Sequence, residues 1–126
     1  MLLLALGGEH PQREPCRTLL AAAATGRAEI HLSVEAGQEI LFHRLRIAGR
    51  DRALEEFALI DRLVHWHDFT SAVLTRSVDL IRDGSIRGRD AVHAASALHA
   101  GFVEFVSPDR DFDLVPGLNR LDPTNC

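Results

Sequence analysis

The stretch from Arg87 to Gly101 and the segment directly after it limit the possible folds more than any other part of the chain. The stretch predicts a helix that begins just after Gly88 and ends at Gly101. Asp90 would lie in its first turn, where the helix dipole and the free backbone N–H groups favour a carboxylate. The small side chains that follow would let this helix lie very close to a sheet; they belong to Ala91, Ala94, Ala95 and Ala97.

The next segment adds a strand and further acids. Residues 102–107 predict a short apolar strand, and the loop from Ser107 to Asp113 holds three carboxylates. In an open α/β sheet, sites form at the carboxyl edge of the strands. One acid at the start of a helix and several acids after the next strand therefore predict a shared acidic site.

The remainder of the chain alternates between helices and strands. Helices are expected at residues 11–24, 34–48, 52–63 and 71–82, and strands at 1–6, 28–33, 64–69 and 118–121. Ser33 and Thr70 suit the N-cap positions of the helices that follow them. This alternation predicts a single α/β domain over residues 1–122, with a mostly parallel sheet and helices on both faces. Residues 123–126 are expected to fray.

The composition is that of an ordinary globular domain. The chain has 126 residues, of which 46% are apolar and 25% charged, so it can bury a proper core. Its formal net charge of −4 argues against bulk electrostatic binding of nucleic acid but leaves room for a local basic groove. Cys16 and Cys126 suggest neither a disulfide nor a metal–thiolate site. The apolar run at residues 1–6 is too short for a signal or a membrane span, so we expect a cytoplasmic protein.

Three acids stand out by position: Glu39, Asp90 and Asp109. In a wound parallel sheet their positions can converge at one crevice, where clustered carboxylates need a cation or protons. Hard oxygen ligands without His or Cys suggest Mg²⁺ or Mn²⁺, which could activate water for phosphodiester cleavage. From spacing alone, plainer roles are favoured for the three acids, as a solvated helix residue, a partner of the helix dipole and a turn residue.

The C-terminal motifs change that balance. The run from Arg89 to Ala95, combined with Val106 to Asp113 and Val115 to Leu118, resembles the C-terminal half of PIN-domain proteins. The branch it resembles most is the VapC-like toxin ribonucleases. The resemblance covers nearly the whole chain, and the two C-terminal motifs are fairly specific when they occur together.

The resemblance implies a PIN-like three-layer α/β/α sandwich and a metal-dependent endoribonuclease that cleaves RNA. It assigns Glu39, Asp90 and Asp109 as the catalytic metal carboxylates, with Asp111 as a weaker supporting ligand for Mg²⁺ or Mn²⁺. It also implies a homodimer, neutralised by a small VapB-like antitoxin that covers the acidic crevice.

The chain departs from the family pattern at its N-terminus. PIN domains carry their first acid on the first strand, in an Asp-x-Asn or Asp-x-Ser motif. Aligned on residues 4–7 and on His10 and Pro11, that Asp would fall a few residues before Met1, so the first strand is expected to be truncated. The alternative function is therefore a catalytically silent PIN-like domain that only binds a partner or RNA.

Several basic residues and histidines have more open roles. Arg89 and Arg110 flank the acids and are candidates to contact phosphate, whereas the arginines between residues 44 and 52 are better explained by helix-end solvation. A hydrogen bond in the core or beside the ligands is the favoured role of His93. His65 and His67 would lie on one face of a strand and could bind Zn²⁺, but the sequence indicates no third ligand.

Overall fold

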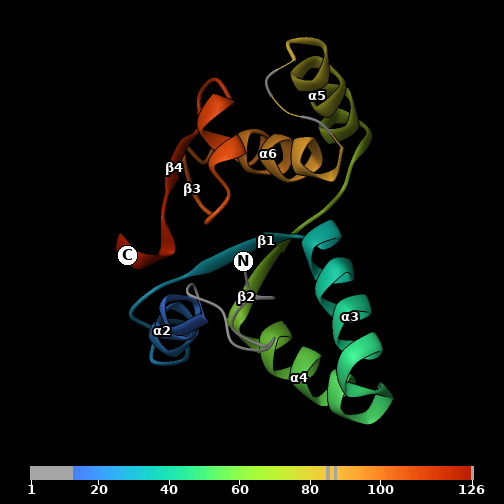
Figure 1. Ribbon diagram of the computed structural model, residues 1–126, viewed down its shortest axis with the longest axis vertical. Coiled ribbons are helices and arrows are strands. Elements are labelled where there is room, and N and C mark those ends of the chain that lie inside the picture. The colour runs from blue at the N-terminus through green and yellow to red at the C-terminus, as the bar shows by residue number, and fades with distance from the viewer. Residues whose placement is uncertain (1–12, 85, 87, 126) are drawn as a thin grey trace.

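The computed structural model describes residues 13–84, 86 and 88–125, so the expected strand at residues 1–6 lies outside the described part of the chain. Figure 1 shows the elements in chain order. The helices are α2 (Arg13–Ala24), α3 (Val34–Ala48), α4 (Arg50–Leu63), α5 (Ser71–Arg82) and α6 (Arg89–His99), with 3₁₀ helices η1 (Arg110–Leu114) and η2 (Pro123–Asn125). The strands are β1 (Ile30–Ser33), β2 (Val64–His67), β3 (Glu104–Val106) and β4 (Asn119–Leu121).

Local capping explains where the central helices begin. The Ser33 hydroxyl accepts the N–H of Ala36 at 3.1 Å at the start of α3. The Thr70 hydroxyl accepts the N–H of Val73 at 3.3 Å at the start of α5. Both N-caps were expected and are confirmed, because each satisfies a backbone donor that a helix start leaves free. Helix α4 begins at Arg50, earlier than expected, directly after Gly49.

The described strands pair in parallel, as expected. β1 pairs with β2, with His31 opposite His65, and β3 pairs with β4, with Phe105 opposite Arg120. Within residues 13–84, 86 and 88–125 these strands form two separate two-stranded sheets. The α/β architecture with parallel strands and helices around them is confirmed.

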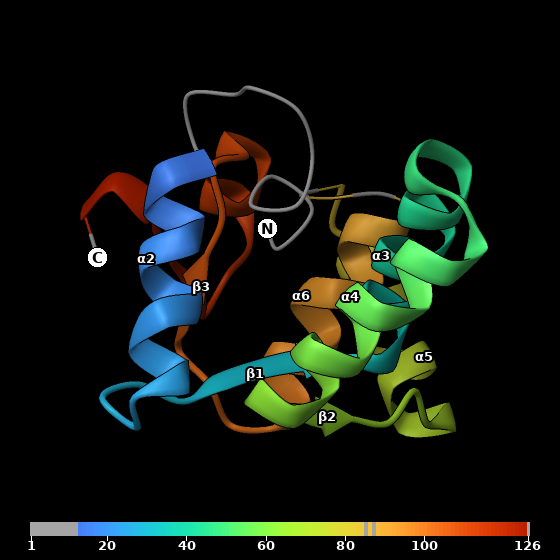
Figure 2. The ribbon, with the colours of Figure 1, turned by 90° about the horizontal axis from the view of Figure 1, so that it is seen from below.

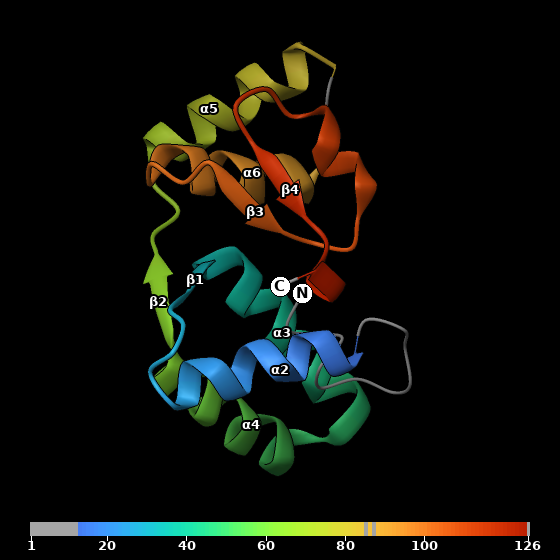
Figure 3. The same cartoon turned by 90° about the vertical axis from the view of Figure 1, so that its left-hand side faces the viewer.

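The helices and strands form two groups, one at each end of the molecule (Figures 1 and 3). Helices α5 and α6 lie with β3, β4 and η1, and helices α2, α3 and α4 lie with β1 and β2. Helix α6 contacts both α3 and β1, so the two ends meet in the middle of the molecule (Figure 2). The start of α6 and the side of α3 are thereby brought close to the loop after β3.

Each end has its own apolar core. The first is centred on α6, where Ala91, Ala94 and Ala95 are fully buried against residues such as Val73 and Phe112. The predicted role of these alanines in close packing is therefore confirmed. The second core joins Ile40 of α3 to Ile60 of α4, with strand residues of β1 and β2 packed against them.

The C-terminal segment, where we expected fraying, contains the short helix η2. Pro123 is buried, and both the backbone N–H and the hydroxyl of Thr124 donate to the Asp122 carboxylate, at 2.9 and 2.6 Å. In the part of the chain that the structure describes, no helix combines the length and apolar character needed to cross a membrane.

Candidate metal centre

Three carboxylates meet where the start of α6 faces the loop after β3. Asp90 comes from the first turn of α6, and Asp109 and Asp111 come from the start of η1. One oxygen from each of them lies within 4.8 Å of the others. Asp90 and Asp109, placed together by sequence reasoning, are thus neighbours, and Asp111 joins them as a full member of the group.

The loop after β3 is held by short-range hydrogen bonds. The Ser107 hydroxyl accepts the N–H of Asp109 at 3.1 Å, and the Asp109 carboxylate accepts the N–H of Asp111 at 2.9 Å. Asp109 is therefore the N-cap of η1, and one of its oxygens is committed to the backbone. These bonds fix the direction in which the two aspartates leave the loop.

Arg120 secures the same loop from β4, a role that sequence reasoning missed. Its Nε donates to the Asp113 carboxylate at 2.8 Å, and its Nη1 donates to the backbone carbonyl of Ser107 at 2.9 Å. The parallel pairing of β3 with β4 brings the guanidinium to this position. The only sequence signal was a third carboxylate in the loop, Asp113, which needed a cationic partner.

The closeness of the three acids affects the pKa of Asp90. Burial raises the pKa of the Asp90 carboxyl, and the negative charges of Asp109, Glu39 and Asp111 raise it further, whereas His93 opposes the change. Repulsion among clustered carboxylates has this effect wherever no cation compensates for it. The centre therefore has the charge pattern of a cation site.

Glu39 lies beside this group without sharing its centre. Its two carboxylate oxygens each lie 3.3 Å from Nε2 of His93, and one lies 3.9 Å from the guanidinium of Arg89. Within the described residues, the group of mutually close acids contains Asp90, Asp109 and Asp111 but not Glu39. Glu39 is still near enough to influence the pKa of Asp90.

His93 connects Glu39 to the start of α3. Its Nδ1 lies 3.2 Å from the Ser33 hydroxyl, which also accepts the N–H of Ala36. A neutral imidazole with its proton on Nε2 satisfies all of these contacts, because the hydroxyl then donates to Nδ1 and Nε2 donates to Glu39. The hydrogen-bonding role favoured for His93 is the one the structure gives it.

The candidate phosphate-binding arginines are accessible. Arg89 is 83% exposed and Arg110 is also exposed, and both belong to the elements that carry the acids. In contrast, Arg44 is buried and donates two hydrogen bonds to Glu56 on α4, at 2.7 and 3.2 Å. Arg52 also donates to Glu56, at 3.1 Å. Arg44 thus joins α3 to α4, whereas Arg52 contacts Glu56 from within α4.

The donor set fits a hard divalent cation. The three grouped side chains offer carboxylate oxygens, which Mg²⁺ and Mn²⁺ prefer, and no thiol or imidazole belongs to this group. Mg²⁺ is usually held by one or two carboxylates together with waters and substrate phosphates, so a group with half-buried Asp90 beside exposed Asp109 and Asp111 suits it. The pKa of Asp90 is raised mainly by burial, and the negative charges of Asp109, Glu39 and Asp111 add to the effect that a cation would offset.

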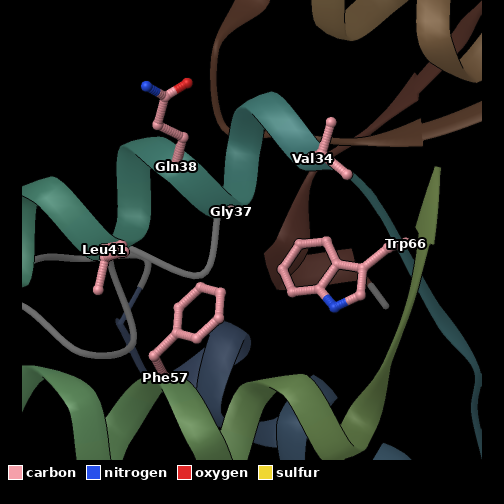
Figure 4. A pocket seen from close by; sticks show the side chains of 6 residues that line it. All are labelled: Val34, Gly37, Gln38, Leu41, Phe57 and Trp66. Carbon is pink, nitrogen blue, oxygen red and sulfur yellow. The ribbon is translucent and has the colours of Figure 1, made fainter. Parts of the chain in front are cut away.

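A hollow between α3, α4 and β2 has a different character from the acidic centre. It is lined by Val34, Gly37, Gln38 and Leu41 of α3, Phe57 of α4 and Trp66 of β2 (Figure 4). The Phe57 and Trp66 rings are stacked with centroids 5.8 Å apart, and the indole N–H donates to Asp61 at 2.7 Å. The lining is almost entirely apolar, so the hollow suits an apolar side chain and offers no chemistry.

The fold and the acidic centre together define a class of protein. The PIN domain family matches residues 2–118, which is most of the chain. The chain belongs to the PIN domain family, and the PIN-like fold expected from the C-terminal motifs is confirmed.

Named relatives place the chain within this family. A VapC ribonuclease of Mycobacterium bovis and Ribonuclease VapC13 of Mycobacterium tuberculosis are each 29% identical over 121 residues, covering 92% of this chain and 90% of the relative. Ribonuclease VapC7 of Mycobacterium tuberculosis is 34% identical over 117 residues, covering 89% of this chain and 79% of the relative. The resemblance to VapC-like proteins is therefore confirmed.

Solved structures show the same fold. A chain of VapBC2 from Rickettsia felis, bound to a DNA fragment from its promoter, aligns with a TM-score of 0.73 at 15% identity, covering 96% of this chain and 92% of that chain. A chain of DNA-bound VapBC from Salmonella typhimurium aligns with a TM-score of 0.71, also at 15% identity, covering 96% and 91%.

Proposed function

We propose that this protein is a metal-dependent endoribonuclease, the toxin of a VapBC-type toxin–antitoxin pair, which cleaves RNA phosphodiester bonds. The observation that carries the proposal is the meeting of Asp90, Asp109 and Asp111 in a chain that belongs to the PIN family. Relatives named as VapC ribonucleases, which match over about nine-tenths of the chain, support it.

The residues of the site would have different roles in binding the metal and the RNA. Asp90, Asp109 and Asp111 would hold Mg²⁺ or Mn²⁺, with Glu39 as a further carboxylate near Asp90. When bound, such a cation neutralises phosphate charge and lowers the pKa of water. Glu39, whose carboxylate His93 contacts at 3.3 Å, would be a further metal carboxylate, as the resemblance implies. Arg89 and Arg110 would contact RNA phosphates on either side, since an exposed guanidinium suits that contact.

The structural neighbours bear on the proposed antitoxin partner. We propose a VapB-like antitoxin that covers the acidic crevice, and the two VapBC complexes among the structural neighbours support this. We also propose that the toxin is a homodimer and acts in the cytoplasm.

A matched pair of variants tests the activity. Asp109→Asn should lower cleavage of single-stranded RNA in Mg²⁺ or Mn²⁺ by at least about a hundredfold, since even residues that only support metal ligands contribute 10–100-fold. Asp51→Asn makes the same chemical change at a side chain that is 93% exposed on α4, and should leave cleavage unchanged. A wild-type protein, free of antitoxin, that cleaves no RNA in a broad panel would favour the silent binding domain instead.

A further inference from the structure

Three histidines gather on one face of the β1–β2 pair, away from the acidic centre's carboxylates. The parallel register places His31 directly opposite His65, and His67 lies on the same face as His65 because side chains alternate along a strand. The other face of the pair, with Leu32, Val64 and Trp66, packs against the core of α3 and α4. The histidine face is therefore not needed to hold that core.

Glu29, which directly precedes β1, completes a possible ligand set. One ligand atom each from Glu29, His31 and His65 lie within 4.8 Å of one another. Nε2 of His31 is 3.5 Å from the Glu29 carboxylate, and the rings of His31 and His65 stack with centroids 4.7 Å apart. Sequence reasoning saw His65 and His67 but no third ligand. The pairing of β1 with β2 supplies it.

The third histidine orients the first. Nδ1 of His31 lies 2.8 Å from Nε2 of His67, so one of the two nitrogens donates a proton to the other. In a neutral imidazole, the ring nitrogen without a proton can accept such a bond. When Nδ1 of His31 is the donor, its Nε2 lone pair is free and points toward Glu29. A ligating imidazole is commonly held in this way, by a hydrogen bond from its other nitrogen.

The Phe102 ring packs against two of these histidines, His31 and His67. Its ring centroid is 4.8 Å from that of His31 and 5.8 Å from that of His67. An apolar ring beside the ligands limits the access of water and strengthens the attraction between a cation and its ligands. Glu29 and His65 are exposed, so an ion can still enter from solvent.

We propose that Glu29, His31 and His65 bind a divalent transition-metal ion, Zn²⁺ in the first instance, as a second metal site that joins β1 to β2. Two imidazoles and one carboxylate form a set that Zn²⁺ accepts, with water in the fourth position, whereas Mg²⁺ prefers oxygen ligands alone. The site shares no residue with the Asp90, Asp109 and Asp111 group. Because one set contains two imidazoles and the other only carboxylates, the two should prefer different ions. This inference does not depend on the ribonuclease activity.

Calorimetric titration with Zn²⁺ on the untagged full chain tests the site, using variants of exposed residues that leave the core intact. Wild type should bind Zn²⁺ saturably, and His65→Gln and Glu29→Gln should each weaken that binding by more than about tenfold, the lower end of the cost of losing a supporting residue. His99→Gln changes an exposed histidine outside the cluster and should bind as wild type does. Asp109→Asn should retain this Zn²⁺ site.

Two further measurements, Co²⁺ absorption and the Mn²⁺ thermal shift, test whether the histidine site is separate from the acidic centre. Co²⁺ bound to wild type should give the visible absorption of imidazole-ligated cobalt, and His65→Gln should lose it while Asp109→Asn keeps it. The thermal shift produced by Mn²⁺ should show the reverse pattern, lost in Asp109→Asn and kept in His65→Gln. No saturable Zn²⁺ binding in wild type, equal Zn²⁺ affinity in wild type and His65→Gln, or Zn²⁺ binding lost only in Asp109→Asn would each overturn the proposal.

Discussion

At the scale of single residues, the charge on Asp90 has opposite effects on the metal-free fold and on metal binding. The ionised carboxylate destabilises the fold, yet it is the form that binds a cation. The pKa of Asp90 is raised above the ordinary 3.8, so the folded protein holds this proton more tightly than the unfolded chain does. Above the raised pKa, the ionised carboxylate therefore destabilises the metal-free fold, and this destabilisation disappears as the pH falls below 3.8. A bound cation would attract the ionised carboxylate, so that the charge on Asp90 would then stabilise the fold.

Asp90→Asn should accordingly raise the melting temperature of the metal-free protein at neutral pH. The gain should shrink as the pH falls through the raised pKa and vanish below the ordinary value of 3.8, because Asp90 is then neutral in both states. Mn²⁺ should stabilise the wild type by mass action and stabilise Asp90→Asn far less. Thermal melts across pH, with and without Mn²⁺, measure both effects; an equal Mn²⁺ shift in the two proteins would contradict the site.

Gly37 provides a test of packing at the apolar hollow. A Cβ at this position would lie 2.7 and 2.8 Å from two ring carbons of Trp66, closer than atoms can pack. Gly37→Ala should therefore cost about 1 kcal/mol, since overpacking of about 1–3 kcal/mol exceeds the roughly 1 kcal/mol that alanine gains in a helix. Urea unfolding measures the change, and the fluorescence of Trp66, the chain's one tryptophan, should change with it. The exposed neighbour Gln38→Ala should show no loss, and a Gly37→Ala more stable than wild type would refute the argument.

At the scale of elements, α3 and α4 are joined by an ion pair rather than by apolar contacts alone. The Arg44 side chain is 7% exposed and that of Glu56 is 16% exposed, and two hydrogen bonds link them. The bond from Arg44 lowers the pKa of Glu56, with Arg52 contributing, despite the opposing effect of burial. The lowered pKa means that this pair stabilises the fold above the unfolded pKa of the carboxyl and that the stability is lost as the pH falls through the folded value.

Glu56→Gln should destabilise the protein by about 3–5 kcal/mol, because it leaves the Arg44 charge buried and without its carboxylate. Glu55→Gln makes the same change at the exposed neighbouring position and should alter stability by less than about 0.5 kcal/mol. Denaturant unfolding at neutral pH measures both. A difference between the two variants that stays unchanged as the pH falls through the folded pKa of Glu56 would argue against the ion pair as its cause, since protonation of Glu56 removes its charge.

How far the sequence predicts these elements depends on whether the signal is local. The start of α3 was predictable because Ser33 caps the helix through a bond to Ala36, three residues away. The ligand role of His31 was not, because it depends on pairing with a strand more than thirty residues later in the chain. Arg120 was missed for the same reason, since only the β3–β4 register brings it to the acidic loop.

At the scale of the whole molecule, the acidic centre is assembled from parts that each have local signals. Asp90 marks a helix start and Asp109 follows a strand, so both positions could be read from the sequence, whereas the resemblance to PIN-domain proteins was needed to favour their convergence over plainer roles. The engagement of Glu39 with His93 and Arg89 was not predictable, because it depends on how α3 packs beside α6. Packing between distant elements is thus the part of the site that sequence patterns leave open.

The outer face of α5 bears on the proposed homodimer. Leu74, Val78 and Ile81 are 51%, 44% and 47% exposed and follow one another at helical spacing, so they form an apolar stripe along this helix. An interface between two copies would remove that stripe from water, and a charge placed in it would oppose the association. Val78→Asp should therefore shift the protein from dimer to monomer at micromolar concentration.

Light scattering coupled to size-exclusion chromatography measures this shift. Arg76→Asp is the matched control, because it places the same side chain on α5 at an exposed position turned away from the stripe, and it should remain dimeric. Retained helical circular dichroism in Val78→Asp would show that the fold survives, since Val78 faces outward while Val73, Ser77 and Leu80 are the buried residues of α5. A monomeric wild type would contradict the homodimer, and a Val78→Asp that stays dimeric would place the interface on another face of the molecule.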